Sequence, residues 1–412
     1  MKYTQTLLFM AVMQASYGWA GAGHDHHHSA EAPNSAEALN SAEASTGDTG
    51  SRPWRLDVQL GYQDVAEPVI PGFLSWNGHR RKAGFALQHL DLGRAFQWSE
   101  YELDGRFTLS LHDNQVELHE AWVRQSLNEQ WQWQAGKVLV DIGLQNTRHS
   151  HDRTFVDQPL YQNALWGGEL SEAAANLSWH QAWSQHWRVS AVAGLLSTEQ
   201  QQTEKSSGAG LVNLVLSYQN HGLTARFKAD VYQAQVNQRG LTLFAFDSNS
   251  HTHGSGATEY FDGVMRHQAL ALEVDWSGNW GTLALASEYQ QRTESGELYS
   301  AAGQTTDVAA DAELESWGGY GSLSWRFPKS VVPLELAFRQ QWLGSDVTLT
   351  NPATRDLDNS LLNQQGTLPQ GRSYLVRWHR QNGSLALQYN QWDDGNLALP
   401  EWIVSGYYGV AF

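Results

Sequence analysis

Apolar side chains recur at every second position along most of this chain, from Trp54 to its last residue. In the first such segment, Leu56 and Val58 share a face with Trp54, whereas Arg55 and Asp57 lie on the opposite face. A period of two is typical of β-strands whose two faces meet different surroundings, while an amphipathic helix would repeat every 3.6 residues. The chain is therefore predicted to be built almost entirely from strands.

The alternation identifies about sixteen strands. They are expected near residues 53–62, 82–92, 96–111, 115–126, 130–140, 172–181, 186–196, 208–219, 222–235, 265–276, 280–291, 314–327, 333–343, 372–381, 384–392 and 402–412. Tight turns are expected at 219–222 and 380–383. Long connections are expected near 63–81, 141–171, 237–264, 292–313 and 344–371. Short turns on one side and long loops on the other are typical of an outer-membrane barrel.

After its N-terminal residues, the sequence contains no run of about 20 apolar residues, the length that a helix needs to cross a bilayer. Backbone polar groups must all be satisfied in lipid, so a chain of strands can cross only as a closed barrel. An even number of strands near sixteen leaves an aqueous lumen. We therefore predict an all-β fold, a transmembrane antiparallel β-barrel of about sixteen strands, preceded by a disordered His-rich tail.

The last strand carries the most specific local signal. It alternates up to a C-terminal aromatic residue through Trp402, Val404, Gly406, Tyr408, Val410 and Phe412. This pattern resembles the terminal signature of bacterial outer-membrane proteins. The 19 tryptophans suit the same location, because aromatic rings gather at the two lipid–water interfaces. The predicted location is the outer membrane of a Gram-negative cell.

The N-terminus has the features of an export signal. Lys2 precedes an apolar core at 7–13, and small residues then give two overlapping cleavage patterns. The apolar core is too short to span a bilayer as a helix. We expect a signal peptide at residues 1–20, removed after Ala20 or Ala22.

Residues 21–51 are rich in His, Ala and Glu and hold almost no large apolar side chain that could offset the entropy of ordering. We expect a disordered periplasmic tail there, followed by the barrel at 52–412. Imidazoles with a carboxylate suit Zn²⁺, Cu²⁺ or Ni²⁺, although a flexible chain cannot enforce one geometry, so that metal binding would be weak. The candidate metal ligands of the tail are His24, Asp25, His26, His27 and His28.

A second candidate metal site lies in the long connection at 141–171. His149 and His151 are two residues apart and would face the same side of an extended chain, with Asp152 beside them. The same His-x-His spacing occurs at 251–253, in a segment rich in Gly, Ser and Asn that is expected to be a surface loop.

The same connection also contains a candidate pore constriction, which consists of Arg148, Arg153 and Asp157. Two arginines beside the histidines argue against a metal ion, because cations repel it. They could instead pair with Asp152 and Asp157 and fix a segment that folds into the lumen. Both interpretations stay open at the level of the sequence, and the constriction is slightly favoured.

Several motifs between residues 82 and 200 carry a resemblance. They are Glu117-Leu118-His119-Glu120-Ala121, Gly136-Lys137, Ile142-Gly143, Asn146, His149-Ser150-His151, Phe155-Val156-Asp157-Gln158-Pro159-Leu160 and Gly167-Gly168. In these motifs the chain resembles a porin-like family of outer-membrane barrels often linked to zinc-responsive regulation and distantly similar to phosphate-selective porins. The family has an Arg before the Pro-Leu pair, where this chain has Gln158, so a fixed basic contact is not implied there.

These observations predict a passive channel for small hydrophilic solutes, and the histidines and the resemblance add divalent cations such as zinc as preferred cargo. The formal charge of −17 would repel nucleic acid, and it would attract cations if the acidic residues line the pore. A generic acidic surface that aids solubility is the alternative explanation of this charge. Such a channel requires no cofactor, and any zinc would be weakly bound. Its expected partners are outer-membrane lipid, small solutes or metal ions and, by analogy with many porin-like barrels, a homotrimer.

Two alternatives remain open. One is a general or anion-preferring porin with an incidental His tail, whose basic constriction would include Arg80, Arg81 and Lys82. The other is a non-transporting structural or adhesive barrel. An enzyme is not expected, because the sequence has no Cys, no Gly-x-Ser-x-Gly elbow, no His-Glu-x-x-His motif and no phosphate-binding Gly loop.

Overall fold

The computed structural model divides the chain into two compact units, Met1–Ser45 and Thr46–Phe412. The structure describes residues 53–64, 83–98, 103–112, 115–197, 208–241, 259–300, 308–350, 370–393 and 398–412, all of which belong to the second unit. The predicted signal peptide, the tail with its five candidate metal ligands and the His-x-His pair at 251–253 lie outside the described residues.

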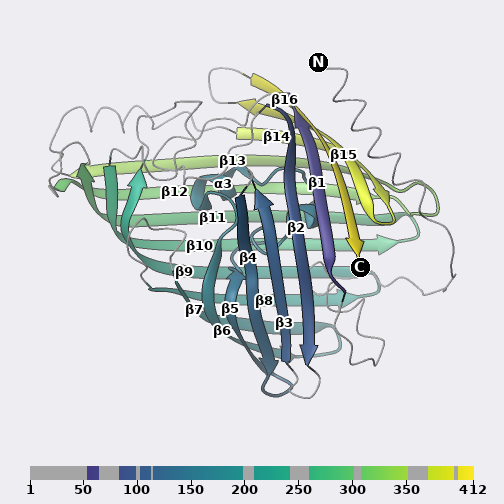
Figure 1. Ribbon diagram of the computed structural model, residues 1–412, viewed down its shortest axis with the longest axis horizontal. Coiled ribbons are helices and arrows are strands. Elements are labelled where there is room, and N and C mark those ends of the chain that lie inside the picture. The colour runs from purple at the N-terminus through teal and green to yellow at the C-terminus, as the bar shows by residue number, and fades with distance from the viewer. Residues whose placement is uncertain are drawn as a thin grey trace. The chain divides into compact units, whose positions relative to one another are not determined.

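Within the described residues, sixteen antiparallel strands form a closed barrel in which each strand pairs with its sequence neighbours and β1 pairs with β16 (Figure 1). The strands are β1 Arg55–Gln63, β2 Gly84–Trp98, β3 Leu103–His112, β4 Gln115–Ser126, β5 Trp131–Leu139, β6 Ser171–Ala182, β7 Trp187–Ser197, β8 Gly208–Asn220, β9 Leu223–Leu241, β10 Glu259–Gly278, β11 Gly281–Ser300, β12 Val308–Arg326, β13 Leu334–Thr350, β14 Gln370–Arg380, β15 Gly383–Asp393 and β16 Ala398–Ala411. The predicted fold class and strand number are confirmed.

The strand bounds differ from the prediction in two regions. β2 continues to Trp98 and β3 begins only at Leu103, so the strand expected at 96–111 was placed too early. The strands β10 and β11 each have 20 residues, well beyond the roughly 9–11 that span a bilayer. Outside lipid both faces of a strand can be polar, so the alternation ends although the strand pairing continues. The connections expected near 237–264, 292–313 and 344–371 are therefore shorter than predicted.

In contrast to a soluble protein, the outward face of the strands is apolar and the inward face is polar. On β14, Tyr374, Val376 and Trp378 point outward and are 45%, 44% and 49% exposed. Ser373 and Arg377, on the other face, point inward and are buried. An apolar outer surface around a polar interior is what a barrel needs when lipid surrounds it. The chain is thus an outer-membrane β-barrel.

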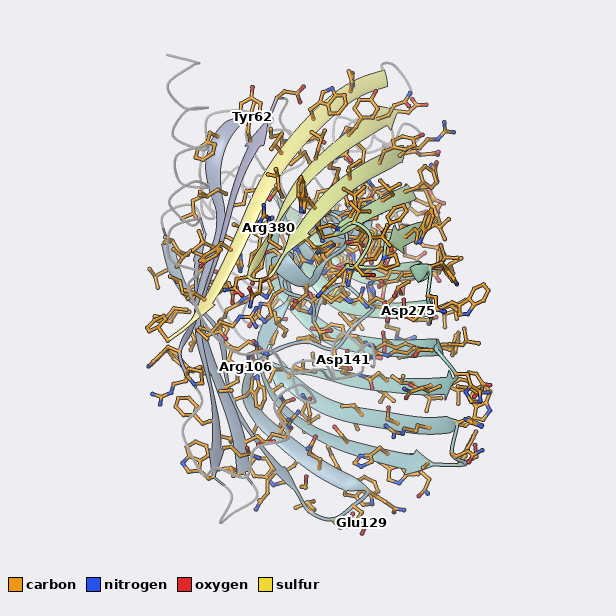
Figure 2. All side chains as sticks on the ribbon, turned by 90° about the vertical axis from the view of Figure 1, so that its right-hand side faces the viewer. Tyr62, Arg106, Glu129, Asp141, Asp275 and Arg380 are labelled. Atoms are coloured by element: carbon orange, nitrogen blue, oxygen red, sulfur yellow. The ribbon has the colours of Figure 1, made fainter. Side chains whose placement is uncertain are left out.

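The connections are short at one end of the barrel. The β8–β9 turn consists of His221 and Gly222, both with positive φ (41° and 81°), as a two-residue hairpin of the primed type requires. Figure 2 shows Glu129, in the short β4–β5 connection, and Tyr62, near the end of β1, at opposite ends of the barrel. The long β5–β6 connection leaves from the end where Tyr62 lies.

The β5–β6 connection, residues 140–170, is called the inward segment because it lies inside the ring of strands. It contains a 3-10 turn, η2 (Ser150–Asp152), and a short helix, α3 (Leu160–Trp166), which packs against β12 and β13 (Figure 1). The helix begins after Pro159 and ends at Gly167, whose left-handed conformation caps it. No helix among the described residues is long and apolar enough to cross a bilayer.

Candidate functional site

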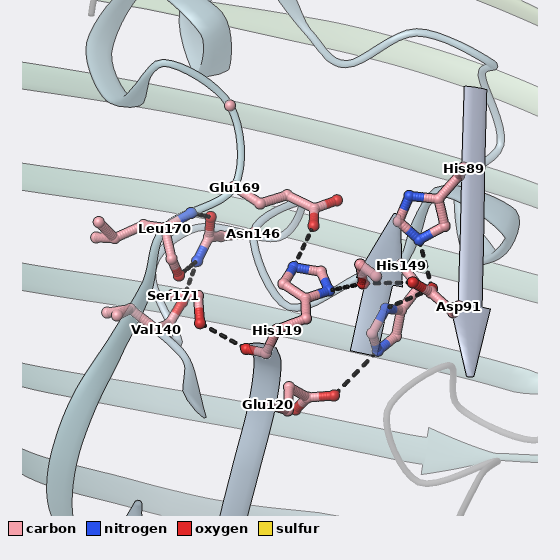
Figure 3. A network of polar contacts seen from close by, with 12 residues as sticks. His89, Asp91, His119, Glu120, Val140, Asn146, His149, Glu169, Leu170 and Ser171 are labelled. Atoms are coloured by element: carbon pink, nitrogen blue, oxygen red, sulfur yellow. Dashed lines mark hydrogen bonds and ion pairs between the residues drawn. The ribbon is translucent and has the colours of Figure 1, made fainter. Parts of the chain in front are cut away.

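The inward segment is closed at its neck by one amide side chain. Asn146 donates from Nδ2 to the carbonyl oxygens of Val140 (2.7 Å) and Leu170 (2.9 Å) and accepts from the Leu170 N–H (2.7 Å), as Figure 3 shows. Val140 and Leu170 also share a backbone hydrogen bond. Because buried backbone groups must be paired, Asn146 allows the chain to leave the sheet and return at nearly the same place.

On one side, the inward segment is attached to the wall formed by β9 to β13. Lys228, fully buried on β9, donates to Asp141 Oδ1 (2.6 Å) and to the Gly143 carbonyl (2.7 Å). The Gly143 N–H donates to Asp230 (2.7 Å), and the Leu144 N–H donates to Glu288 (3.0 Å). Strand side chains therefore take over the hydrogen bonds that the irregular backbone lost when it left the sheet.

Gly143 is required at this contact. Its φ is +62°, and a Cβ placed there would lie 1.8 Å from Glu288 Oε1 and 2.5 Å from Gln290 Nε2. Both neighbours are buried and hydrogen-bonded, so neither can move aside without losing a partner. The backbone of the inward segment thus comes closer to β11 than any larger residue would allow.

Apolar packing reinforces this attachment. Leu165 and Tyr161 of α3 are fully buried, and Trp166 packs against Tyr232 and His267 with ring centroids 5.5 Å and 4.3 Å apart. These side chains belong to the main apolar cluster of the molecule, which lies inside the barrel. The inward segment is therefore held on this side as a protein core is held, by close packing.

Asp157, a predicted constriction residue, is buried where the inward segment meets β13 and β15. Arg339 donates to its Oδ1 (2.5 Å), and Gln388 donates to the same oxygen (2.6 Å). The Arg339 guanidinium also lies over the Phe155 ring, 4.4 Å from its centroid. A fully buried ion pair with further hydrogen bonds fixes the position of this part of the segment.

The other two predicted constriction residues pair with carboxylates that the sequence did not suggest. Arg148 forms an ion pair with Glu273 of β10, and Arg153 forms one with Glu169 within the inward segment. The expected partners were Asp152 and Asp157. Those two lie close to the arginines in the sequence, but the segment turns, so its side chains meet strands and residues that are distant in the chain.

His151 and Asp152 lie at η2. The His149 and His151 rings stack, with centroids 5.6 Å apart and an interplanar angle of 8°. The prediction placed them on an extended chain, whereas in the structure a 3-10 turn brings the two rings together. His151 also stacks on Tyr407 of β16 (5.0 Å), and its Nε2 lies 3.5 Å from Asp152. Burial lowers the pKa of His151, which favours its neutral form. Metal binding by this pair stays a prediction.

Opposite the apolar attachment, the segment meets a group of ionisable residues that we call the histidine cluster: His89 and Asp91 of β2, His119 and Glu120 of β4, and His149 of the inward segment. All five side chains are buried. His89 and Asp91 are two apart on a strand, so both point into the barrel. The register shifts opposite His119, and this bulge directs two consecutive residues, His119 and Glu120, toward the interior.

The contacts of the cluster form one network inside the barrel, in which Ser110 links Asp91 to His119 (Figure 3). His89 Nε2 contacts Asp91 Oδ2, and His149 Nδ1 lies 3.7 Å from that same oxygen. His149 Nε2 lies 3.2 Å from Glu120 Oε2. His119 Nε2 lies 2.7 Å from Glu169.

Glu169 joins the inward segment to the cluster and is charged. Burial alone would raise the pKa of this carboxyl, but Arg153 and His119 outweigh burial and hold its pKa well below the ordinary value. The attachment of the segment on this side thus depends on charge and hydrogen bonding.

Sequence reasoning identified His149 but missed the buried ionisable side chains around it. His89, Asp91 and Glu169 were not singled out, and His119 and Glu120 appeared only within a family motif. The available signal was the His-x-Asp spacing at 89–91 within a segment of alternating residues. Both residues occupy positions that face the lumen, where a charged pair is more informative than at a loop.

The comparisons with known proteins agree with the barrel. Among solved structures, the chain is similar to OmpTdeltaL8, a loop L8 deletion mutant of OmpT, an outer membrane protein of Vibrio cholerae. The TM-score is 0.51 at 10% identity, with 88% of this chain and 100% of that chain covered. It is also similar to Salmonella typhi OmpF in complex with daunomycin, with a TM-score of 0.51 at 12% identity and coverage of 87% and 97%.

No protein-family model and no curated protein matches the chain. At these identities the structural likeness concerns the fold alone. The zinc-linked family suggested by the motifs stays a prediction. What the geometry and the comparisons together establish is an outer-membrane β-barrel of sixteen antiparallel strands within the described residues, with residues 140–170 folded into its interior.

Proposed function

We propose that this chain is a diffusion channel for small hydrophilic solutes across the outer membrane. The observation that carries the proposal is the polar interior of a closed sixteen-stranded barrel, narrowed by a segment that is anchored to opposite walls. A barrel that served only as a membrane anchor would need no such segment. A polar lumen of this strand number is suited to the passage of water and small solutes.

The proposal extends to a preference for cations, with divalent metal ions such as zinc as favoured cargo. The formal charge of −17 supports it. So do the pairings of Arg148 and Arg153 with carboxylates, because neutralised arginines attract anions weakly. In this interpretation Arg148, Arg153 and Asp157 fix the constriction, and the side chain of Asp152 is exposed beside it. We further propose a homotrimer, by analogy only, and no catalytic activity.

Single-channel recording in planar bilayers tests the proposal. The refolded protein is recorded under a KCl gradient, and the reversal potential gives the charge preference. A cation-selective conductance that added Zn²⁺ reduces is the expected result. An anion-selective conductance would favour the general porin, and no conductance would favour a structural or adhesive barrel.

A further inference from the structure

We propose that His89, Asp91 and His149 form a binding site for a divalent transition-metal ion, which ties the inward segment to β2. Two of these residues come from the barrel wall and the third comes from the inward segment. The site would therefore act as a metal crosslink across the lumen. This inference does not depend on the chain being a channel.

The spacing of the ligand atoms suits such an ion. Each residue offers one ligand atom, and these three atoms lie within 4.8 Å of one another. Two ligands of a tetrahedral zinc ion lie about 2.0–2.1 Å from the metal and hence roughly 3.3 Å from each other. His149 Nδ1 and Asp91 Oδ2 are 3.7 Å apart, so a small adjustment would let both bind one ion.

His149 Nδ1 is the observation that distinguishes a metal site from an ordinary hydrogen-bonded network. The side chain is buried, and its Nδ1 has no hydrogen-bond partner. Its separation from Asp91 is too long for a hydrogen bond. A buried polar atom without a partner is unfavourable, and an ion between the two residues would satisfy it.

The surrounding residues orient the ligands as they do in known metal sites. Glu120 lies 3.2 Å from His149 Nε2, so it can accept a hydrogen bond from a proton on Nε2. The other ring nitrogen, Nδ1, would then carry a lone pair directed toward Asp91. Ser110 donates to Asp91 Oδ1, whereas Oδ2 contacts His89 Nε2, so an ion would take the place of the proton shared between those two atoms. Two imidazoles and one carboxylate favour Zn²⁺ and neighbouring ions such as Co²⁺ over Mg²⁺ or Ca²⁺.

The test measures metal binding to the full-length chain in detergent, with His24, His26, His27 and His28 replaced by Asn so that the tail does not contribute. Zn²⁺ is titrated by calorimetry, and Co²⁺ is followed by its visible absorption. We expect one Co²⁺ with a four-coordinate spectrum. His149→Asn and His89→Asn should each weaken binding by at least about tenfold, the range seen when metal sites lose a supporting contact.

His379→Asn is the matched control, because His379 pairs with Glu335 (2.8 Å) in a second His–carboxylate contact that, among the described residues, belongs to no group of three potential metal ligands. It should leave Zn²⁺ affinity unchanged. Affinity that is unaltered in His149→Asn would overturn the proposal, and so would an equal loss in His379→Asn.

Glu120→Gln covers the case in which the ligand variants fail to fold. It keeps all three ligands but no longer fixes the His149 tautomer, so affinity should fall by about 10–100-fold. Wild-type affinity in a folded Glu120→Gln barrel would contradict the proposal. Because binding is measured without a current, the site can fail while the channel is confirmed, or the reverse.

Discussion

The two walls that hold the inward segment differ in their chemistry. Against β9 to β13 the segment is packed by apolar side chains and by hydrogen bonds to its own backbone, as Leu165 and Gly143 show. Against β2 and β4 it is held by histidines and carboxylates, among them His149 and Glu169. Both walls contain buried ion pairs, such as Arg339 with Asp157 on the first. The wall at β2 and β4 differs because it groups imidazoles with carboxylates, the side chains that bind transition-metal ions.

The packed wall should be the more sensitive to truncation of a charge. Arg339→Met would leave Asp157 buried without its ion-pair partner, which is expected to lower the free energy of unfolding by about 3–5 kcal/mol. Urea unfolding in lipid vesicles measures it. The double variant Arg339→Met/Asp157→Asn should recover most of the loss. A single-variant loss below about 1 kcal/mol would mean that the pair does not anchor the segment.

Leu165→Ala tests the packing itself. The side chain is fully buried, so its truncation should destabilise the barrel by about 2–5 kcal/mol through lost burial and the cavity left behind. The loosened segment should also give noisier single-channel currents. Leu270→Ala on β10 is the control, since that residue is exposed on the outer face. Equal losses in both variants would show that the effect concerns the barrel and not the segment.

Glu169 tests the ionisable wall through pH. Its folded-state pKa lies well below the ordinary value of 4.5, so its charge stabilises the fold above pH 4.5, and this contribution is lost as the pH falls through the folded-state pKa. Glu169→Gln should cost about 1.5–3 kcal/mol near neutral pH, the range for a hydrogen bond to a charged group. Below pH 4.5 the variant should lose less stability than the parent. Parallel unfolding curves at all pH values would contradict this assignment.

The smallest effect is expected at Asp152. Its carboxylate is exposed and lies 3.5 Å from the His151 ring. Asp152→Asn should change the free energy of unfolding by less than about 1 kcal/mol, as for most exposed pairs. If the constriction selects by charge, the reversal potential should nevertheless shift toward weaker cation preference. An unchanged reversal potential would remove Asp152 from the selectivity proposal.

Much of the barrel could be read from the sequence because lipid imposes a strict rule on strands. Within the bilayer, outward positions such as Tyr374 and Val376 must be apolar, whereas the inward position of Ser373 can be polar. The resulting period of two marks the strands. Beyond the bilayer the rule lapses, and the ends of β10 and β11 were missed. The tight turn at His221 and Gly222 was predictable because its backbone conformation restricts the residues.

By itself the sequence determined the fold class, the strand number and the presence of a long connection rich in charge between 141 and 171. The tertiary structure decided where that connection goes and which residues it meets. Local spacing relates His149 to His151, but only closure of the barrel places His149 beside Asp91 and Glu120. Contacts between distant parts of the chain depend on register and on the path of a loop, and neither leaves a periodic pattern in the residues that make them.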